Sequence, residues 1–477
     1  MSIDDELDGV AAQALRVQLA SFAGPALPPE WAELLAEGLG GICLFGSNLA
    51  GSSSDAAALV GAIRGARADV LVATDEEGGD VTRLHPRSAS PVPGAAVLGA
   101  VDSVALTRRV GAAVGAELAV AGIDLDLGPV ADVNSNPDNP VIGTRSFGAE
   151  PALVARHVAA WVAGLQAAGV AACVKHFPGH GDTAQDSHLT LPVLPVGLDV
   201  ARSRELVPFA AAVAAGAAAV MTSHILVPEL DPSAPATLSA PVLGLLRAEL
   251  GYDGAIVSDA LDMAGASAGR GIPEAAVLAL AAGCDLLCLG PDQPAALVRE
   301  VQAAVVAAVA SGRLPRARLD DAAERVGRIR RGLGAGGSGG GEDLPGAGEL
   351  ATAARAACVV EGVLPDLAGA RLVSVETEAN IAVGAGRWGL VPDLVAAGGD
   401  ALPDGPLVVQ VRDAHRRPEV AAMLAAHPGP LVVVEWGWPG PRAGWEDAPH
   451  ARICTRGNGR PSIAAVTALL AEAGLRR

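Results

Sequence analysis

The chain has 477 residues, a formal net charge of −19 and an aromatic content of only 3%. This length exceeds one ordinary domain, and a hydrophobic fraction of 51% is ample for a large core built from Ala, Val and Leu. The negative charge argues against nucleic acid or an anionic membrane surface as a partner. No apolar run is long enough to predict a membrane span, and the acidic start of the chain does not resemble a signal peptide.

The six cysteines are scattered along the chain and flanked by apolar residues. Cys284 and Cys288 are four residues apart, but no second pair accompanies them to complete a zinc site. This pattern favours reduced thiols in the core. Together with the lack of a signal peptide, it predicts a cytoplasmic protein.

Eight short apolar runs precede residue 332, and most are separated by Ala-rich segments long enough for a helix, such as 103–121 and 151–168. The runs are 17–22, 41–45, 70–74, 123–127, 171–174, 219–222, 255–257 and 285–289. Strands that alternate with helices predict a parallel sheet, and eight repeats predict a (β/α)8 TIM-like barrel over residues 1–331. An open doubly wound sheet is the competing fold. No Gly-x-Gly-x-x-Gly turn follows the first strand, which disfavours a dinucleotide site.

Residues 332–348 are rich in glycine and predict a flexible linker. Beyond them, 371–375, 407–411 and 431–435 have the apolar character of buried strands, and 418–426 that of a helix. We therefore expect a small, sandwich-like α/β domain over residues 349–477.

Polar side chains follow five of the predicted barrel strands, where such barrels carry their catalytic groups. They are Asp75, Glu76, Glu77 and Arg83 after the third run, Asp132, Asn134, Asn139 and Arg145 after the fourth, Lys175 and His176 after the fifth, Ser223 and His224 after the sixth, and Ser258 and Asp259 after the seventh. Polar clusters at so many strand ends predict one cleft built by the fold.

Lys175 is the only lysine in the chain, against 33 arginines, because Lys and Arg total 34. It begins a run, 175–188, that holds three of the nine histidines. An ammonium is compact and a guanidinium is broad and planar, so the two are not equivalent in a crowded site. We expect Lys175 to be needed for its size; a bias of composition is the alternative.

Asp259 ends an apolar strand, where it would serve as a nucleophile or general base; the alternative is that it caps a helix at 260–263. Asp186 and His188 are two apart in an extended loop, so the carboxylate can hold the imidazole as an acid/base dyad. A set of four residues, His180, Asp182, Asp186 and His188, could instead bind a metal. Metal-dependent hydrolases on barrels usually carry a His-x-His at the end of the first strand, and the first two predicted strands here have no histidine at their ends, which disfavours this alternative.

Several blocks, in order, resemble family 3 glycoside hydrolases of the bacterial β-N-acetylglucosaminidase type. They are Thr74-Asp-Glu-Glu-Gly-Gly with Arg83, Gly128-Pro-Val-Ala-Asp-Val, Asn139-Pro-Val-Ile-Gly-Thr-Arg-Ser-Phe-Gly, Lys175-His-Phe-Pro-Gly-His-Gly-Asp-Thr with Asp186-Ser-His188, Ser223-His-Ile and Ser258-Asp259. Glu76 stands where that family usually has Gln, and Asp80 where Arg is common. We expect both to add negative charge near the sugar site.

The resemblance implies a retaining mechanism in which Asp259 is the nucleophile and His188, held by Asp186, is the general acid and then base. It implies that the terminal sugar is bound by Asp75, Arg83, Arg145, Lys175, His176 and His224. No cofactor or metal is expected. The predicted activity is removal of terminal β-linked N-acetylglucosamine from oligosaccharides in cell-wall (peptidoglycan) turnover or from chitin fragments.

Two other functions remain open. A neutral histidine base does not repel an anionic acceptor, so phosphate could replace water and make the protein a phosphorylase. A non-catalytic sugar-binding protein is disfavoured, because a nucleophile, a dyad and sugar-binding residues occur together.

Overall fold

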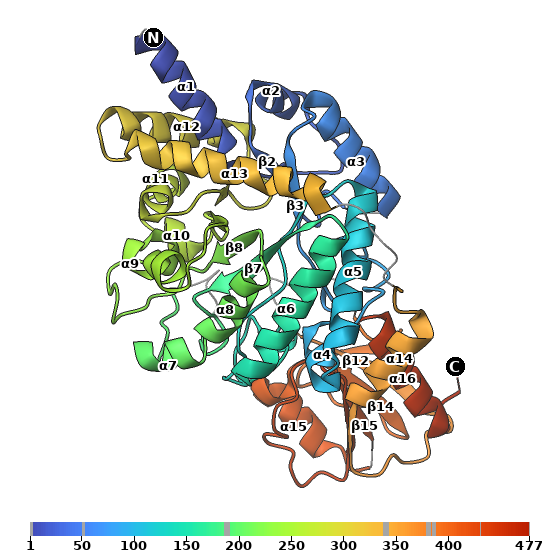
Figure 1. Ribbon diagram of the computed structural model, residues 1–477. Helices are drawn as coiled ribbons and strands as arrows, with labels where there is room; N and C mark the ends of the chain where they lie inside the picture. Colours follow the sequence, from blue (N-terminus) through green and yellow to red (C-terminus); the bar gives the residue numbers. More distant parts are fainter. Residues whose placement is uncertain are drawn as a thin grey trace.

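The computed structural model describes residues 3–49, 53–185, 191–336, 343–377, 383, 388–429 and 431–476. Asp186 and His188 lie outside these residues. The chain forms two α/β units, and the smaller, C-terminal one (orange to red in Figure 1) packs against one side of the larger. Among the described helices, none combines the length and apolar character that crossing a membrane requires.

The larger unit is a barrel of eight parallel strands. In spatial order they are β10 (Leu287–Cys288), β1 (Gln18–Ala20), β2 (Gly41–Leu44), β3 (Leu71–Thr74), β6 (Leu125–Asp126), β7 (Ala171–Phe177), β8 (Ala219–Thr222) and β9 (Ala255–Val257). A parallel bridge between Val257 of β9 and Leu286, the residue before β10, joins the two ends of this order and closes the barrel. Each of the eight predicted runs overlaps one of these strands, which confirms the barrel.

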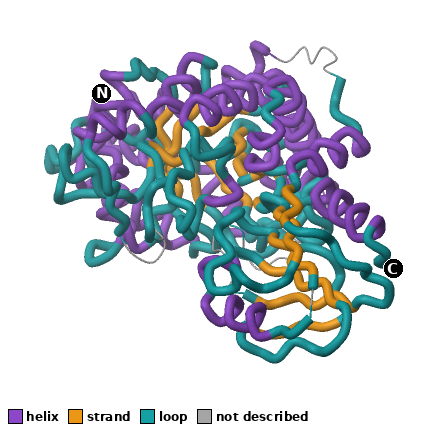
Figure 2. Tube along the Cα trace, turned by 90° about the horizontal axis from the view of Figure 1, so that it is seen from below, coloured by secondary structure: helices purple, strands orange, loops and turns teal. Residues whose placement is uncertain are grey.

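Helices surround the strands, as Figure 2 shows from below. They are α1 (Ile3–Arg16), α2 (Pro29–Glu37), α3 (Ser53–Ala66), α4 (Ala95–Val101), α5 (Val104–Ala121), α6 (Pro151–Ala167), α7 (Leu198–Ser203), α8 (Leu206–Ala214), α9 (Ala240–Gly244), α10 (Ala264–Ser267), α11 (Ile272–Ala282), α12 (Ala295–Ala310) and α13 (Arg316–Gly336). The predicted helices at 103–121 and 151–168 are α5 and α6. Ser103 caps α5 by accepting a hydrogen bond from the backbone N–H of Leu106.

The barrel core has two parts, because alternate residues of a strand point to opposite faces. One set of strand side chains packs outward against the helices. The other set, including Leu19 and Leu71, fills the barrel interior, where Val326 and Ile329 of α13 join it. The amino-terminal end of the barrel is therefore covered by α13, and the carboxyl-terminal end is left for a site.

The smaller unit is a six-stranded sheet between helices. The strand order is β11 (Val359–Glu361), β16 (Ala451–Cys454), β15 (Val432–Glu435), β14 (Leu407–Val411), β12 (Arg371–Glu376) and β13 (Leu394–Ala397). Only the β11–β16 pair is antiparallel. Helix α15 (Pro418–Ala426) packs on one face, and α16 (Arg460–Glu472) packs on the other. This confirms the predicted α/β domain, although β11, β13 and β16 were not predicted.

The segment predicted as a linker is partly helical. Helix α13 continues to Gly336, and α14 (Ala347–Ala357) begins before residue 348 and packs against α16 and α4. Residues 337–342 lie outside the described part of the chain. The six cysteines are free, and all except Cys358 are buried.

Candidate active site

A cavity of about 290 Å³ lies at the carboxyl-terminal end of the barrel. Its lining comprises Phe45, Asp75, Glu77, Val81, Arg83, Leu127, Val141, Arg145, Lys175, His176, His180, Met221, Asp259, Ala260, Asp262, Met263, Cys288 and Pro291. Seven residues predicted from the strand ends are therefore brought together around one space: Asp75, Glu77, Arg83, Arg145, Lys175, His176 and Asp259.

Glu77 connects two of the cations in this cavity. It lies on a hairpin that was not predicted, β4 (Glu76–Gly78) and β5 (Val81–Thr82), which directly follows Asp75. Its two carboxylate oxygens accept hydrogen bonds from Nη2 and Nε of Arg145, both at 2.8 Å. The Nζ atom of Lys175 lies 2.7 Å from Oε1 of Glu77 and 2.6 Å from Oδ1 of Asp75.

Burial disfavours charge on each of these groups, but their opposite charges outweigh it. Arg145 and Lys175 hold the pKa of Glu77 far below its usual range. Asp75 and Glu77 raise the pKa of Lys175 above its usual value despite burial, and Glu77 does the same for Arg145. Glu77, Lys175 and Arg145 are thus charged at neutral pH and present fixed donors and acceptors to a polar ligand.

A second cluster is organised by Asp132, which is fully buried. Its Oδ2 lies 2.7 Å from Nδ1 of His176, and its Oδ1 accepts the backbone N–H groups of His180 at 2.7 Å and of His176 at 3.2 Å. Burial opposes ionisation of Asp132, but the charge and hydrogen bond of His176 lower the pKa of this carboxyl. Burial lowers the pKa of His180 to about 4, so its imidazole is neutral at neutral pH.

Strand β7 is longer than predicted. It continues to Phe177, so Lys175 and His176 belong to the strand, and the peptide bond between them is cis. The register of the β7–β8 pairing shifts between Val174 and Phe177. This local irregularity lies where the side chains of Lys175 and His176 line the cavity.

Asp259 follows β9 and lines the cavity. Its backbone N–H donates to Oγ1 of Thr222 at 3.2 Å, and its Oδ1 accepts the backbone N–H of Ala260 at 2.8 Å. No helix begins at 260–263, because α10 starts at Ala264. The alternative reading of Asp259 as the cap of a helix at 260–263 is therefore wrong, and the residue lines the cavity.

Three expected site residues do not reach the cavity. The ring of His224 is buried between Oγ1 of Thr237 and the carbonyl oxygen of Ala260, both at 2.9 Å, so it supports the backbone next to Asp259. Oε2 of Glu76 accepts the N–H groups of Arg83 and Leu84 at 2.8 and 3.0 Å.

Asp80 points toward the smaller unit and pairs with Arg412 at 3.0 Å. Neither Glu76 nor Asp80 lines the cavity, although Asp75 and Glu77, on either side of Glu76, do.

The proposed acid/base dyad, Asp186 and His188, lies outside the described residues. The loop that leads to it is anchored by Asp182, whose Oδ2 accepts from Arg204 at 2.5 Å, and by His180. Within the described part of the chain, no three His, Cys, Asp or Glu side chains come together as a metal site.

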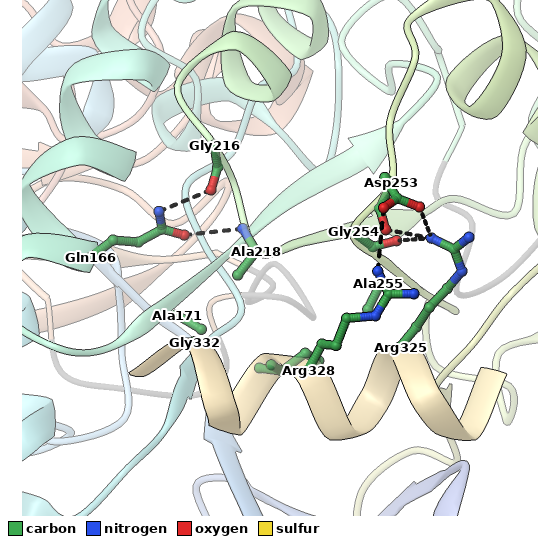
Figure 3. Close-up of a pocket in the computed structure, with 11 residues that line it drawn as sticks. Gln166, Ala171, Gly216, Ala218, Asp253, Gly254, Ala255, Arg325, Arg328 and Gly332 are labelled. Atoms are coloured by element: carbon green, nitrogen blue, oxygen red, sulfur yellow. Dashed lines mark hydrogen bonds and ion pairs between the residues drawn. The ribbon is translucent and has the colours of Figure 1, made fainter. Parts of the chain in front are cut away.

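A larger cavity, of about 410 Å³, lies at the opposite end of the barrel and is shown in Figure 3. Its lining includes Ala171 and Ala255, which begin β7 and β9, and Arg325 and Arg328 of α13. Both arginines pair with Asp253, at 2.8 and 3.2 Å. Because this end is away from the polar strand ends and its charges are paired with one another, we assign it a structural role.

Comparison with known proteins gives a family match over most of the barrel. Residues 17–329 match the model described as "Glycosyl hydrolase family 3 N terminal domain". A relative named beta-hexosaminidase from Methylococcus capsulatus is 37% identical over 292 residues, which cover 59% of this chain and 85% of the relative. Beta-hexosaminidase A from Pseudoalteromonas piscicida is 38% identical over 283 residues, 54% of this chain, but the match spans only 47% of that longer protein.

A solved structure resembles both units together. It is a glycoside hydrolase family 3 beta-N-acetylglucosaminidase from Paenibacillus sp., with a TM-score of 0.85 and 30% sequence identity. The likeness covers 98% of this chain and 97% of that one. The arrangement of barrel and smaller sheet is thus shared with a protein of that description.

Proposed function

The chain belongs to glycosyl hydrolase family 3, and we propose that it is a β-N-acetylhexosaminidase that releases terminal β-linked N-acetylglucosamine from cell-wall or chitin-derived oligosaccharides. The observation that carries this proposal is the cavity at the carboxyl-terminal end of the barrel, in which Asp259 shares one space with Asp75, Glu77, Arg145 and Lys175. The names of the relatives support it.

The size and charge of the cavity suit one neutral sugar. A volume of about 290 Å³ is at the small end of ligand pockets, which favours a single terminal residue over an internal stretch of a chain. Its carboxylates and cations are paired, so they offer hydrogen-bond acceptors and donors to hydroxyls without a large net charge. Apolar neighbours such as Val141 and Met263 provide surface for the sugar face or an acetamido methyl group.

The proposed reaction is a double displacement with retention. A carboxylate oxygen of Asp259 attacks the anomeric carbon and forms a glycosyl ester, while His188 gives a proton to the departing oxygen. His188 then takes a proton from water, which attacks the same carbon and releases Asp259 and the sugar. An imidazole has an ordinary pKa of about 6.5, so it can perform both transfers near neutral pH.

The test is hydrolysis of an aryl N-acetyl-β-glucosaminide by the purified chain, with the aryl β-glucoside as a comparison and with phosphate present or absent. We expect the N-acetyl substrate to be preferred and the rate to be independent of phosphate. Formation of a sugar 1-phosphate would favour the phosphorylase instead. Binding of N-acetylglucosamine without turnover of any substrate would indicate a sugar-binding protein.

Two variants test the assigned roles. Asp259→Ala should lose on the order of 10³-fold or more in kcat while remaining folded, because the covalent route is removed. His188→Ala should lose far more on substrates with poor leaving groups than on activated aryl glycosides, which need no protonation. Equal losses on both substrate classes would contradict His188 as the general acid, and Asp186→Ala should show a weaker form of the same pattern.

A further inference from the structure

Asp80 links the sugar-binding end of the barrel to the smaller domain. It lies in the turn between β4 and β5, only three residues from Glu77 and from Arg83. Its side chain is 3% exposed, which is unusual for a turn carboxylate and indicates specific partners.

One carboxylate oxygen of Asp80 faces the smaller domain. Oδ1 accepts a hydrogen bond from Nη1 of Arg412 at 3.0 Å and from the backbone N–H of Asn458 at 2.9 Å. Arg412 directly follows β14, and Asn458 lies between β16 and α16, so both partners come from segments that follow the carboxyl ends of strands in the second sheet. The contact is close, because a Cβ on neighbouring Gly79 would lie 3.2 Å from the carbonyl oxygen of Asn458.

The other oxygen faces the loop that carries Arg145. Oδ2 accepts from Oγ1 of Thr144 at 2.5 Å, and the next residue, Arg145, makes the two-pronged contact with Glu77. A charge-assisted bond of this length fixes the position of the donor more strongly than a neutral one. A single carboxylate therefore joins the hairpin of Glu77, the loop of Arg145 and the smaller domain.

The smaller domain meets the same loop at further points. The ring Nε2 of His415 lies 3.2 Å from the carbonyl oxygen of Pro137, and Nη1 of Arg416 donates to the carbonyl oxygen of Asn139 at 3.5 Å. The side chain of Trp438 lies against Gly143. The loop from Pro137 to Arg145 is thus held between the barrel and the second domain along its length.

We propose that Asp80 is a positioning residue through which the smaller domain fixes Thr144 and Arg145, and hence the Glu77–Arg145 wall of the sugar pocket. This deepens, and rests on, the proposed glycosidase function. Asp80 touches no substrate. It acts by holding the hairpin of Glu77 and the loop of Arg145 in a fixed position relative to each other. A misplacement of about 1 Å in such a wall can reduce the rate about 100-fold.

The experiment compares Asp80→Asn, Thr144→Val and the double variant in the full chain, with Glu349→Gln as a matched control. Glu349 of α14 pairs with Arg109 of α5 at 2.6 Å, so it is also an inter-domain contact, but its partner is neither on the hairpin of Asp80 nor on the loop of Arg145. Two quantities are measured: kinetics with an aryl N-acetyl-β-glucosaminide, including product inhibition by N-acetylglucosamine, and hydrogen exchange of the backbone over residues 139–148.

Each single variant should lower kcat/KM by about 10- to 100-fold, weaken product inhibition and speed exchange over 139–148. The double variant should be no worse than the poorer single variant, because both remove one contact. Glu349→Gln should stay within about twofold of the wild type. Arg412→Lys, which keeps a cation near Asp80, should retain more activity than Arg412→Met.

Wild-type kinetics and exchange in both single variants would overturn the proposal, as would additive losses in the double variant or an equal loss in Glu349→Gln. Thr144→Val leaves the contacts of Asp80 with the smaller domain in place. If Asp80→Asn does not fold, the kinetics and hydrogen exchange of Thr144→Val therefore test the proposal alone. The hydrogen-exchange measurement requires no turnover. An inactive wild type would refute the proposed function, but exchange over 139–148 would still show whether Asp80 fixes the loop of Thr144 and Arg145.

Discussion

Asp132 and His176 form a buried carboxylate–imidazole pair, with Oδ2 of Asp132 2.7 Å from Nδ1 of His176. Because Nδ1 faces the carboxylate, Nε2 is the ring nitrogen left to face Arg145, at 3.5 Å, and the cavity. The partner of one imidazole nitrogen sets the tautomer and orientation of the other. Asp132 also holds the backbone of His180, so it fixes both histidines that enter the site from this segment.

We expect Asp132→Asn to lower kcat/KM by about 10- to 100-fold, because a hydrogen bond to a charged group contributes about 1.5–3 kcal/mol. An amide keeps the shape of the carboxylate but has one oxygen and no charge, so it holds the ring of His176 and the backbone of His180 less firmly. Steady-state kinetics provide the measurement, with thermal unfolding as the check on folding. Full activity in Asp132→Asn would leave Asp132 as a structural residue only.

Glu76→Gln should leave kcat/KM close to the wild type and increase stability at pH 8. Oε2 of Glu76 is occupied by two backbone N–H groups, which an amide oxygen can also accept. Burial raises the pKa of Glu76, so its ionised form carries a cost in the folded state. That cost arises as pH rises above the ordinary pKa of the carboxyl and is absent in acid. Thermal unfolding at pH 4 and pH 8 should show a gain of about 1–3 °C only at the higher pH.

A larger loss of activity in Glu76→Gln would contradict its placement outside the cavity. The matched variant is Glu77→Gln, one residue along. It weakens the bonds to Arg145 and Lys175 and should lose activity by about 100-fold, because both cations of the cavity wall lose their charged partner and a displacement of about 1 Å can cost that much in rate.

The contrast between Glu76 and Glu77 shows what the sequence could and could not predict. The periodicity of strands and helices predicted the barrel, and the polar residues at the strand ends predicted seven residues of the cavity lining, Glu77 among them. Adjacent strand residues point in opposite directions, and only the hairpin of β4 and β5 decides which glutamate faces the cavity. That hairpin is short and carries no apolar pattern, so nothing in the local sequence distinguishes the two.

Asp80 and His224 were misplaced for a different reason. The partner of Asp80, Arg412, is 332 residues away in the sequence, and no local pattern encodes such a contact. His224 follows a strand as a ligand would, but its ring turns back to the carbonyl oxygen of Ala260. Position at a strand end thus predicts proximity to the site, whereas side-chain direction depends on contacts that form only in the folded chain.

Glu205→Gln should stabilise the protein increasingly between pH 5 and pH 7. Glu205 is fully buried beside Gly179, and its Oε2 has no partner among the described residues. Burial raises its pKa from about 4.5 to about 7 despite the contact with Arg204. The folded state therefore binds a proton that the unfolded state releases, and wild-type stability falls as pH rises through this range.

The expected gain of Glu205→Gln at pH 8 is on the order of 1–3 kcal/mol in the free energy of unfolding, and it should vanish near pH 4. Arg204 keeps Asp182 as a partner at 2.5 Å, so the variant does not leave this cation unpaired. Urea unfolding at several pH values measures the difference. A gain that is equal at all pH values would show that ionisation of Glu205 is not its cause.

Lys175 occupies a space that suits an ammonium group. Its side chain is 2% exposed, and Nζ lies within 2.7 Å of both Asp75 and Glu77. Arg145 already binds both oxygens of Glu77 from the other side. A second guanidinium would need to fit its broad, planar head between Arg145 and Asp75, although its charge would be correct.

We therefore expect Lys175→Arg to lower kcat/KM nearly as much as Lys175→Met, by at least about 100-fold, even though Arg preserves the charge. The loss should include kcat, because contacts to the sugar that strengthen in the transition state accelerate glycoside cleavage. Steady-state kinetics of the two variants measure this, with thermal unfolding as the check on folding. If Lys175→Arg retained kcat/KM near the wild type, size would not be the reason for the lysine, and its uniqueness in the chain would reflect composition alone.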